Sequence, residues 1–224
     1  AIVMADADVD LAVRAIIASR VINTGQVCNC AERVYVDRQI KDIFIDKLLQ
    51  GMEQVKVGNP SLRSDLDMGP LIDASALNSI EKKVEKALQQ GAKLLCGGHR
   101  IGDKGYFYAP TLLDEARQDM DIVREETFGP VLPIVTYSNV EEAISWANDC
   151  EYGLTSSVYT QNLDQAFRIM RSLKFGETYI NRENFEAMQG FHAGWRKSGI
   201  GGADGKHGLE EYLQTHVVYL ETQI

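Results

Sequence analysis

Residues 131–181 alternate between strand-like and helix-like segments, and this alternation constrains the fold more than any other feature of the chain. The segments are three strand-like runs and the two helix-like runs between them, over 131–137, 154–160, 177–181, 140–148 and 163–173. A helical crossover lets the strands on either side of it run in the same direction. The sequence therefore predicts an α/β fold, a three-layer, open and mostly parallel sheet flanked by helices.

The local patterns also predict where individual elements begin and end. Asn139 and Asn162 stand where helix N-caps belong, because an Asn side chain can accept a hydrogen bond from a first-turn N–H. The other expected elements are a strand end at 2–4, a helix capped by Asp6 or Asp8, a strand over 31–36, a helix over 40–55, a helix over 75–90 capped by Ser75 with Leu88 in its apolar stripe, and strands over 93–96 and 215–220.

The long segment 182–208 is rich in glycine and irregular, and long loops of this kind are usually functional or disordered. Its aromatic residues, His192 and Trp195 argue against disorder. Ligand sites in open parallel sheets lie at the carboxyl ends of the strands. We therefore expect Asn181 and the segment after it to lie on the functional edge of the sheet.

Composition excludes several classes of function. The chain has 224 residues, 45% of them hydrophobic, and a formal net charge of −9, which argues against a nucleic-acid or membrane-surface partner. No run of apolar residues is long enough for a membrane span. The four cysteines are too few for a disulfide framework, so we expect a cytoplasmic protein.

Cys28 stands in the turn-like stretch 23–30, two residues after the pair Gly25-Gln26, between an apolar helix and a strand-like run. A cysteine on such a turn could be an exposed nucleophile, because thiolates attack carbonyl carbon well. The alternative is a small buried hydrophobic residue. A metal site with Cys30 is rejected, since the spacing is short and no second pair of ligands accompanies it. Cys96 and Cys150 are expected in the core.

Four motifs occur in a fixed order along the chain. They are Val21-x-x-x-Gly25-Gln26-x-Cys28, Glu125-Glu126-Thr127-Phe128-Gly129-Pro130, Tyr152-Gly153-Leu154-Thr155 with Gly176 to Asn181, and Lys197-Ser198-Gly199-Ile200-Gly201. Each is weak alone, but together they are specific, and over essentially its whole length the chain resembles the catalytic domain of the aldehyde dehydrogenase superfamily. The stretch 179–201 is especially similar to the bacterial branch that oxidises lactaldehyde and glycolaldehyde.

The resemblance implies a role for each of five residues. Cys28 would attack the aldehyde carbon as a thiolate, and its backbone N–H would donate to the resulting oxyanion. Glu126 would accept hydrogen bonds from the nicotinamide-side ribose of NAD, with Phe128 packed nearby. Glu186 and His192 would bind the polar end of the substrate. Without the resemblance, Glu126 and Glu186 would be interpreted as solvated surface groups, and His192 as part of a surface pair.

The sequence departs from the family pattern in one important respect. The family's Leu-Glu-Leu-Gly-Gly-Lys motif, which holds its general base, does not occur, and residues 95–98 only echo it. The family's nucleotide-binding half is also missing, and residues 199–204 do not form a dinucleotide fingerprint. The chain opens Ala-Ile-Val-Met, without an initiator methionine. We therefore expect a fragment, with a catalytic domain over 1–208, an oligomerisation segment over 209–224 and no NAD-binding domain.

The predicted function of the parent is oxidation of a small hydroxy-aldehyde to its acid through a Cys28 thiohemiacetal and thioester, with the fragment alone inactive. Two alternatives remain: a CoA-acylating enzyme that uses the same thioester, and a non-catalytic oligomerisation module. The resemblance implies a homodimer or homotetramer, with the strand over 215–220 pairing with a neighbouring subunit, since an unpaired edge invites aggregation. The choice between NAD and NADP stays open.

Overall fold

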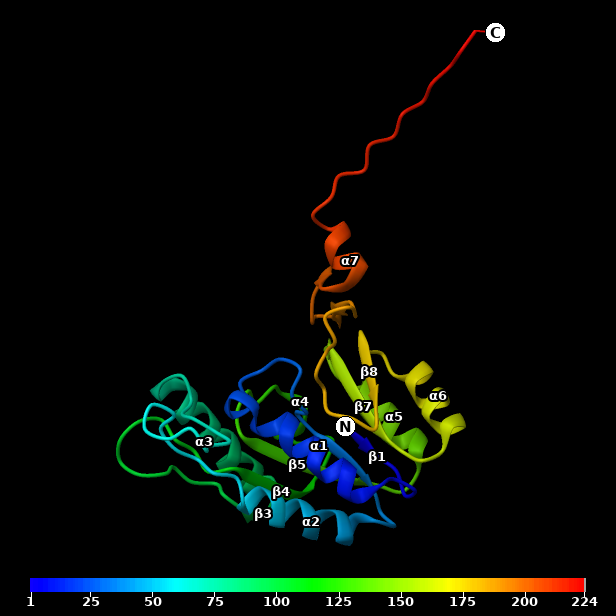
Figure 1. Ribbon diagram of the computed structural model, residues 1–224. Coiled ribbons are helices and arrows are strands. Elements are labelled where there is room, and N and C mark those ends of the chain that lie inside the picture. The colour runs from blue at the N-terminus through cyan, green and yellow to red at the C-terminus, as the bar shows by residue number, and fades with distance from the viewer. Residues whose placement is uncertain (224) are drawn as a thin grey trace.

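The computed structural model describes residues 1–223, and its centre is a seven-stranded sheet (Figure 1). The strands are β1 (Ile2–Val3), β2 (Val34–Asp37), β3 (Lys93–Cys96), β4 (Thr111–Ala116), β5 (Val131–Tyr137), β7 (Thr155–Tyr159) and β8 (Glu177–Ile180). Their spatial order is β3-β4-β5-β2-β1-β7-β8. Neighbouring strands are parallel except β3 and β4. The mostly parallel α/β sheet predicted from the sequence is confirmed.

The two N-terminal strands lie in the middle of the sheet. The alternating unit over 131–181 forms as expected, with α5 (Val140–Asn148) and α6 (Leu163–Ser172) between its strands. However, β5 and β7 are not neighbours, because β2 and β1 fill the space between them. Ile2 pairs with Tyr35 on one side and with Val158 on the other. The sheet is therefore completed by residues that are far apart in the sequence.

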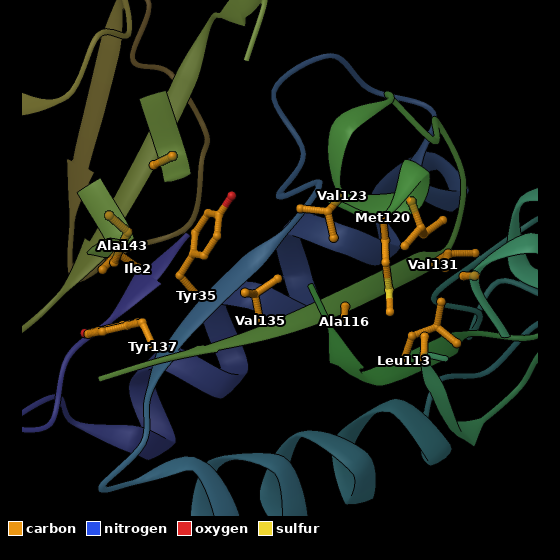
Figure 2. Close-up of a cluster of buried hydrophobic side chains, with 14 of the residues drawn as sticks. Ile2, Tyr35, Leu113, Ala116, Met120, Val123, Val131, Val135, Tyr137 and Ala143 are labelled. Atoms are coloured by element: carbon orange, nitrogen blue, oxygen red, sulfur yellow. The ribbon is translucent and has the colours of Figure 1, made fainter. Parts of the chain in front are cut away.

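Helices cover both faces of the sheet. One face carries α1 (Val9–Val21) and α2 (Lys41–Glu53), and the other carries α3 (Ala74–Gln89), α4 (Asp121–Arg124), α5 and α6. Side chains alternate across a strand, so Ile2 and Tyr35 enter the core under α3–α6 (Figure 2), whereas Val3, Val34 and Val36 enter the core under α1 and α2. This arrangement is the expected three-layer architecture.

The helix caps at Asp8, Asn139 and Asn162 form as predicted. The prediction for α3 was wrong in detail. Its N-cap is Asp73, whose extended backbone lets the carboxylate accept from the N–H of Ala76, and Ser75 lies inside the first turn. At the other end of α3, Leu88 is 38% exposed while Ala87 is buried.

Two strands differ from the sequence prediction. The strand expected over 31–36 begins only at Val34, because Ala31 and Glu32 bond to the side chain of Arg20 instead of entering the ladder. Strand β4 was not predicted. Its apolar pattern is broken by acidic residues, and Glu115 has a φ of 56° at an irregularity in the pairing with β5.

After β8 the chain forms an arm of short elements (Figure 1). They are β9 (His192–Ala193), β10 (Trp195–Arg196), β11 (Gly202–Ala203) and α7 (Gly205–Glu210), and β10 pairs with β6 (Tyr152–Gly153). Residues 215–220 are exposed and have no hydrogen-bonded neighbour within residues 1–223. A strand is defined by its ladder to a neighbour, so the expected strand does not form within the described chain. Residue 224 of the expected segment 209–224 lies outside the described residues.

No helix within residues 1–223 has both the length and the apolar character needed to cross a bilayer.

Candidate active site

Cys28 lies on an exposed turn between α1 and β2. A short 3₁₀ segment, η1 (Ile22–Gly25), follows α1, and Asn23, Thr24 and Gly25 all have positive φ values of 44°, 61° and 73°. A Cβ on Gly25 would lie 2.3 Å from the carbonyl oxygen of Gly129, so only glycine fits there without displacement. This turn leaves Cys28 exposed rather than buried, as its interpretation as a nucleophile requires.

Cys28 and Glu126 line the same cavity, which has a volume of about 290 Å³. Its wall includes apolar side chains such as Ile2, Tyr35 and Phe175, and polar groups from the later chain, Asn184, Lys197 and Ser198. The wall segments lead into β1, β2, β5 and β7. The cavity therefore lies at the amino ends of the parallel strands.

The expectation was therefore wrong for Asn181 itself, although the segment after it reaches the cavity. Asn181 lies at the carboxyl ends of the strands, where its side-chain amide bonds to the backbone N–H and C=O of Thr160. The chain after Asn181 then returns to the cavity, because Asn184 Nδ2 donates to Thr155 Oγ1 at 3.3 Å and Gly153 N–H donates to Ser198 Oγ at 2.9 Å. The loops that enter the strands, rather than those that leave them, carry Cys28 and Glu126.

Glu126 presents a free carboxylate to the cavity. Within residues 1–223 this carboxylate makes no hydrogen bond or ion pair, although its backbone carbonyl accepts from Lys83 Nζ at 2.7 Å. Burial raises the pKa of Glu126, and the neighbouring charge of Glu32 raises it further, while Lys83 and Arg20 act in the opposite direction. The carboxylate is thus an unused acceptor beside the cysteine.

Phe128 lies on the other side of the same turn. Its ring is 42% exposed and its φ is 53°. It lines a second, open hollow together with Asn23 and Gln26, rather than the cavity of Cys28. The turn over 125–130 therefore directs Glu126 and Phe128 toward different spaces on either side of the cysteine turn.

Glu186 and His192 bond to different partners. Glu186 Oε2 accepts from Asn29 Nδ2 at 2.6 Å, so this carboxylate lies beside the residue that follows Cys28. His192 Nδ1 lies 2.5 Å from Glu177 Oε1, and the other oxygen of Glu177 accepts from the hydroxyl of Tyr179. Neither Glu186 nor His192 lines the cavity of Cys28.

The other cysteines differ from expectation. Cys96 and Cys150 are only half-buried, and Cys150 lines the cavity that Cys28 lines. The buried cysteine is Cys30, which is 5% exposed. Cys96, the last residue of β3, packs against the core under α1 and α2, whereas the core assignment of Cys150 was wrong because it lies in the segment between α5 and β6.

Cys28 is expected to react with iodoacetamide at least about tenfold faster than any other cysteine of the chain, because alkylation needs both access and a thiolate. Burial raises the pKa of Cys30 to about 11 and raises that of Cys96. Time-resolved mass spectrometry of the labelled peptides at mildly alkaline pH measures the four rates. Equal labelling of Cys28 and Cys150 would count against a nucleophilic role for Cys28.

Cys30 is expected to make the folded chain less stable in alkali. Its pKa is raised from 9.0 to about 11 by burial, so folding favours the protonated thiol. The contribution of this thiol to stability is full below pH 9 and falls by roughly 2 kcal/mol as the pH rises to 11, because the unfolded thiol then binds fewer protons than the folded one. Urea unfolding over this range checks the slope, and Cys30→Ala should reduce it by this amount, leaving the part that comes from the buried tyrosines. Identical slopes for the two proteins would contradict the assignment.

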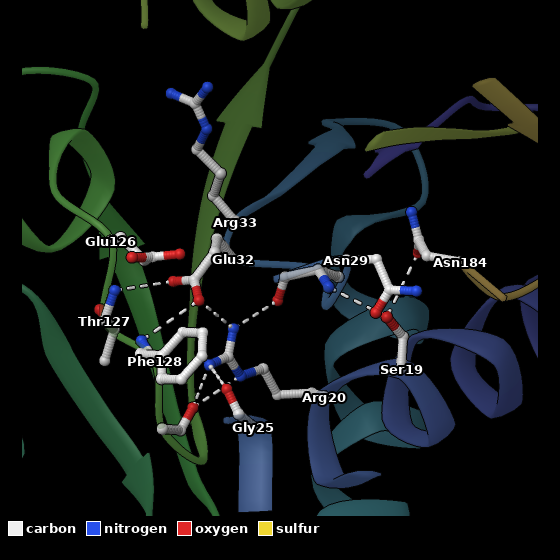
Figure 3. A network of polar contacts seen from close by, with 12 residues as sticks. Ser19, Arg20, Gly25, Asn29, Glu32, Arg33, Glu126, Thr127, Phe128 and Asn184 are labelled. Atoms are coloured by element: carbon white, nitrogen blue, oxygen red, sulfur yellow. Dashed lines mark hydrogen bonds and ion pairs between the residues drawn. The ribbon is translucent and has the colours of Figure 1, made fainter. Parts of the chain in front are cut away.

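Sequence reasoning missed a polar network behind the cysteine turn (Figure 3). Arg20 is fully buried, and Glu32, Ser19 and Asn184 belong to the same group of contacts. Ser19 Oγ donates to Asn184 Oδ1 at 3.2 Å and accepts from the N–H of Ala31 at 2.9 Å. The available signal was an arginine on the apolar face of the helix over 9–21, since a buried charge requires a partner.

Comparison with known proteins identifies relatives of this chain. Residues 1–218 match the sequence profile of the Aldehyde dehydrogenase family. Lactaldehyde dehydrogenase of Escherichia coli (strain K12) is 64% identical over 222 residues, which are 99% of this chain and 46% of that protein. The crystal structure of lactaldehyde dehydrogenase from Escherichia coli superposes with a TM-score of 0.97 at 65% identity, and covers 99% of this chain and 46% of that chain.

A third similarity is to the structure of a 3,6-anhydro-L-galactose dehydrogenase in complex with NAP. Its TM-score is 0.92 at 43% identity, and the match covers 95% of this chain and 45% of that one. The chain thus spans about half the length of the curated relatives it matches.

Proposed function

The chain belongs to the aldehyde dehydrogenase family, and we propose that it forms the cysteine-bearing half of an enzyme that oxidises small hydroxy-aldehydes to carboxylic acids with a nicotinamide dinucleotide. One observation carries the proposal: the exposed Cys28 and the unpaired carboxylate of Glu126 line one cavity. Cys28 supplies a nucleophile for the aldehyde, and Glu126 supplies an acceptor of hydrogen bonds from the cofactor, in the same cavity.

The substrate class is proposed from a relative and from one contact. The relative with 64% identity bears the name lactaldehyde dehydrogenase. The carboxylate of Glu186 lies against Asn29, directly beside Cys28, and a carboxylate accepts hydrogen bonds from hydroxyl groups. We assign Glu186 and His192 to the hydroxyl end of lactaldehyde or glycolaldehyde. A site built to bond a hydroxyl discriminates strongly against substrates that lack one.

The residues of the cavity fit a nicotinamide dinucleotide. Ribose hydroxyls are donors, and the carboxylate of Glu126 is an acceptor that no residue in 1–223 occupies. Phe128, on the same turn, is exposed to the neighbouring hollow rather than to this cavity. A dinucleotide held there would supply the acceptor for a hydride from the carbon attached to sulfur. We propose NAD as the natural cofactor, with NADP as the alternative to be measured beside it.

The residues of the cysteine turn perform the first step. The thiolate of Cys28 attacks the aldehyde carbon, a carbon–sulfur bond forms, and the carbonyl electron pair moves to oxygen. The backbone N–H of Cys28 makes no hydrogen bond within residues 1–223, so it is available as a donor to this oxyanion. Loss of hydride from the carbon then restores the carbonyl and leaves a thioester on Cys28.

Hydrolysis completes the reaction. Water attacks the thioester carbon, the carbon–sulfur bond breaks, and the thiolate of Cys28 returns as the acid leaves. This step needs a general base to remove a proton from water. The family motif that supplies this base does not occur in residues 1–224. We therefore expect no sustained turnover of aldehyde from this chain by itself.

A chimaera tests the proposed function. This chain replaces the matching segment of E. coli lactaldehyde dehydrogenase, and reduced cofactor is followed by absorbance with lactaldehyde, glycolaldehyde or propanal. We expect turnover with both hydroxy-aldehydes at a kcat/KM at least about tenfold above that for propanal, since one unpaired polar group in a buried site costs this much or more. Parallel assays with NAD and NADP identify the cofactor.

Two outcomes would count against the proposal. Product that forms only when CoA is added would identify an acylating enzyme instead. A correctly assembled chimaera without turnover, beside an active parent, would show that the chain is not a catalytic half. The isolated chain is assayed in the same series, and reduced cofactor from it would overturn the expectation that it is inactive.

We also propose that the C-terminal segment pairs with a second copy of the chain in a homodimer or homotetramer. Apolar side chains are largely exposed along it, at Leu213, Val217, Val218, Tyr219 and Leu220. Their burial against another subunit would remove the unpaired edge. Light scattering should give a defined oligomer for the chain and a monomer after removal of residues 212–224. The same mass for both would contradict this pairing.

A further inference from the structure

A buried ion pair joins the cysteine turn to the loop that carries Glu126 and Phe128. Arg20 is fully buried at the end of α1, and its Nη1 lies 3.0 Å from Oε1 of Glu32, whose side chain is only a quarter exposed. Figure 3 shows the two side chains meeting between the two loops.

The guanidinium of Arg20 bonds to both loops at once. Nη1 donates to the carbonyl of Ala31 at 2.8 Å, and Nη2 donates to the carbonyl of Gly25 at 3.3 Å. These two carbonyls stand three residues on either side of Cys28. Nε donates to the carbonyl of Gly129 at 2.7 Å, on the other loop. One rigid, planar fork of donors thus holds both ends of the cysteine turn against the end of the second loop.

Glu32 completes the connection from the opposite side. Its Oε2 accepts from the N–H of Thr127 at 2.9 Å, and its Oε1 accepts from the N–H of Phe128 at 3.3 Å (Figure 3). Phe128 adopts a positive φ, a conformation that bulky residues rarely adopt. The carboxylate of Glu32 therefore holds the residue after Glu126 and the strained residue that follows it.

We propose that Arg20 and Glu32 are positioning residues that fix the loop of Glu126 and Phe128 relative to Cys28, so that the two loops open and close as one unit. The roles of Cys28, Glu126 and Phe128 rest on the proposed function, but the mechanical coupling of the loops does not. A pair that only stabilised the fold would leave the relative position of the loops unchanged in the molecules that remain folded.

Hydrogen exchange on the isolated chain tests the coupling. The reporters are the bonded amides of Thr127 and Phe128 in one loop and of Gln26, Cys30 and Ala31 in the other. In Glu32→Gln, which keeps the shape and removes the charge, both loops should exchange at least about tenfold faster. Exchange in β5 and α5 should stay within about twofold. The matched control is Asp65→Asn, which breaks the exposed pair with Arg63 and should change neither loop.

A double-mutant cycle adds a second criterion. Arg20→Lys keeps the charge but loses the fork, and it should accelerate both loops as Glu32→Gln does. The double variant should show little further acceleration, because either change alone already breaks the connection between the two loops. The proposal is overturned if Glu32→Gln accelerates only residues 125–130, if all segments accelerate equally, or if the effects of the single variants multiply in the double variant.

Kinetics of the chimaera separate positioning from stability. Each rate is divided by the concentration of active sites, which is measured by titrating Cys28 with iodoacetamide. Glu32→Gln should raise the cofactor KM and lower kcat at least about tenfold, with the aldehyde KM changed less than about twofold, and Glu32→Asp should recover most of the loss. Unchanged normalised constants would overturn the positioning role. If the unmodified chimaera is inactive, the proposed function fails, while hydrogen exchange still decides whether the loops are coupled.

Discussion

Replacing Cys28 with alanine in the chimaera is expected to lower kcat with lactaldehyde on the order of 10³-fold or more, because no covalent intermediate can form without the thiolate. The other residues of the cavity remain, so binding of the cofactor should persist, and fluorescence titration with the reduced dinucleotide measures it. Cys28→Ser, which keeps a much weaker nucleophile, should be nearly as slow. Steady-state rates and a single-turnover experiment measure the loss.

The control for this loss is Cys96→Ala. Cys96 lies on β3 and does not line the cavity of Cys28, so its removal should leave kcat within about twofold. Substantial turnover from the Cys28→Ala chimaera would contradict the assigned nucleophile and would direct attention to Cys150, which lines the same cavity.

Replacing Arg20 with methionine is expected to lower the free energy of unfolding of the chain by about 3–5 kcal/mol, the usual cost of removing one partner from a buried ion pair. The loss leaves Glu32 without its cation and leaves the carbonyls of Gly25 and Ala31 without a donor, while the carbonyl of Gly129 keeps only the N–H of Val131. Buried acceptors without partners carry a desolvation penalty of their own. Urea unfolding followed by circular dichroism measures the change.

Two further variants make this prediction specific. Arg20→Met combined with Glu32→Leu should recover part of the lost stability, since an apolar pair of similar volume avoids an isolated buried charge. Asp65→Asn, at the exposed pair with Arg63, should cost less than about 0.5 kcal/mol. If Arg20→Met and Asp65→Asn have equal effects, the buried pair does not stabilise the fold as described.

Features encoded by neighbouring residues could be predicted from the sequence. The caps at Asn139 and Asn162 and the alternating elements over 131–181 depend on local hydrogen bonds and side-chain periodicity, and they form as expected. The position of β1 and β2 between β5 and β7 could not be predicted in this way. Strand order depends on which distant apolar faces pack together, and a linear pattern does not record that choice.

The candidate site, like the fold, could be predicted from the sequence only in part. Cys28 and Glu126 were predicted from motifs, and they line one cavity. The edge of the sheet was predicted wrongly from Asn181, because the rule for carboxyl ends assumes that the loops leaving the strands form the site. Here the loops entering the strands do so. Arg20 stands out on the apolar face of its helix, but its partners could not be predicted, because only the fold brings Glu32, Gly25 and Gly129 around it.

The central position of β1 has a consequence for synthesis on the ribosome. Ile2 and its partner Val158 are made roughly 8–30 s apart at about 5–20 residues per second. During that interval β1 and β2 exist without their outer neighbours β7 and β5. Their unpaired edges are then open to association with other chains. The nascent chain is therefore expected to need protection by chaperones until residues 131–159 have emerged, and folding of the whole sheet to be a late, cooperative event.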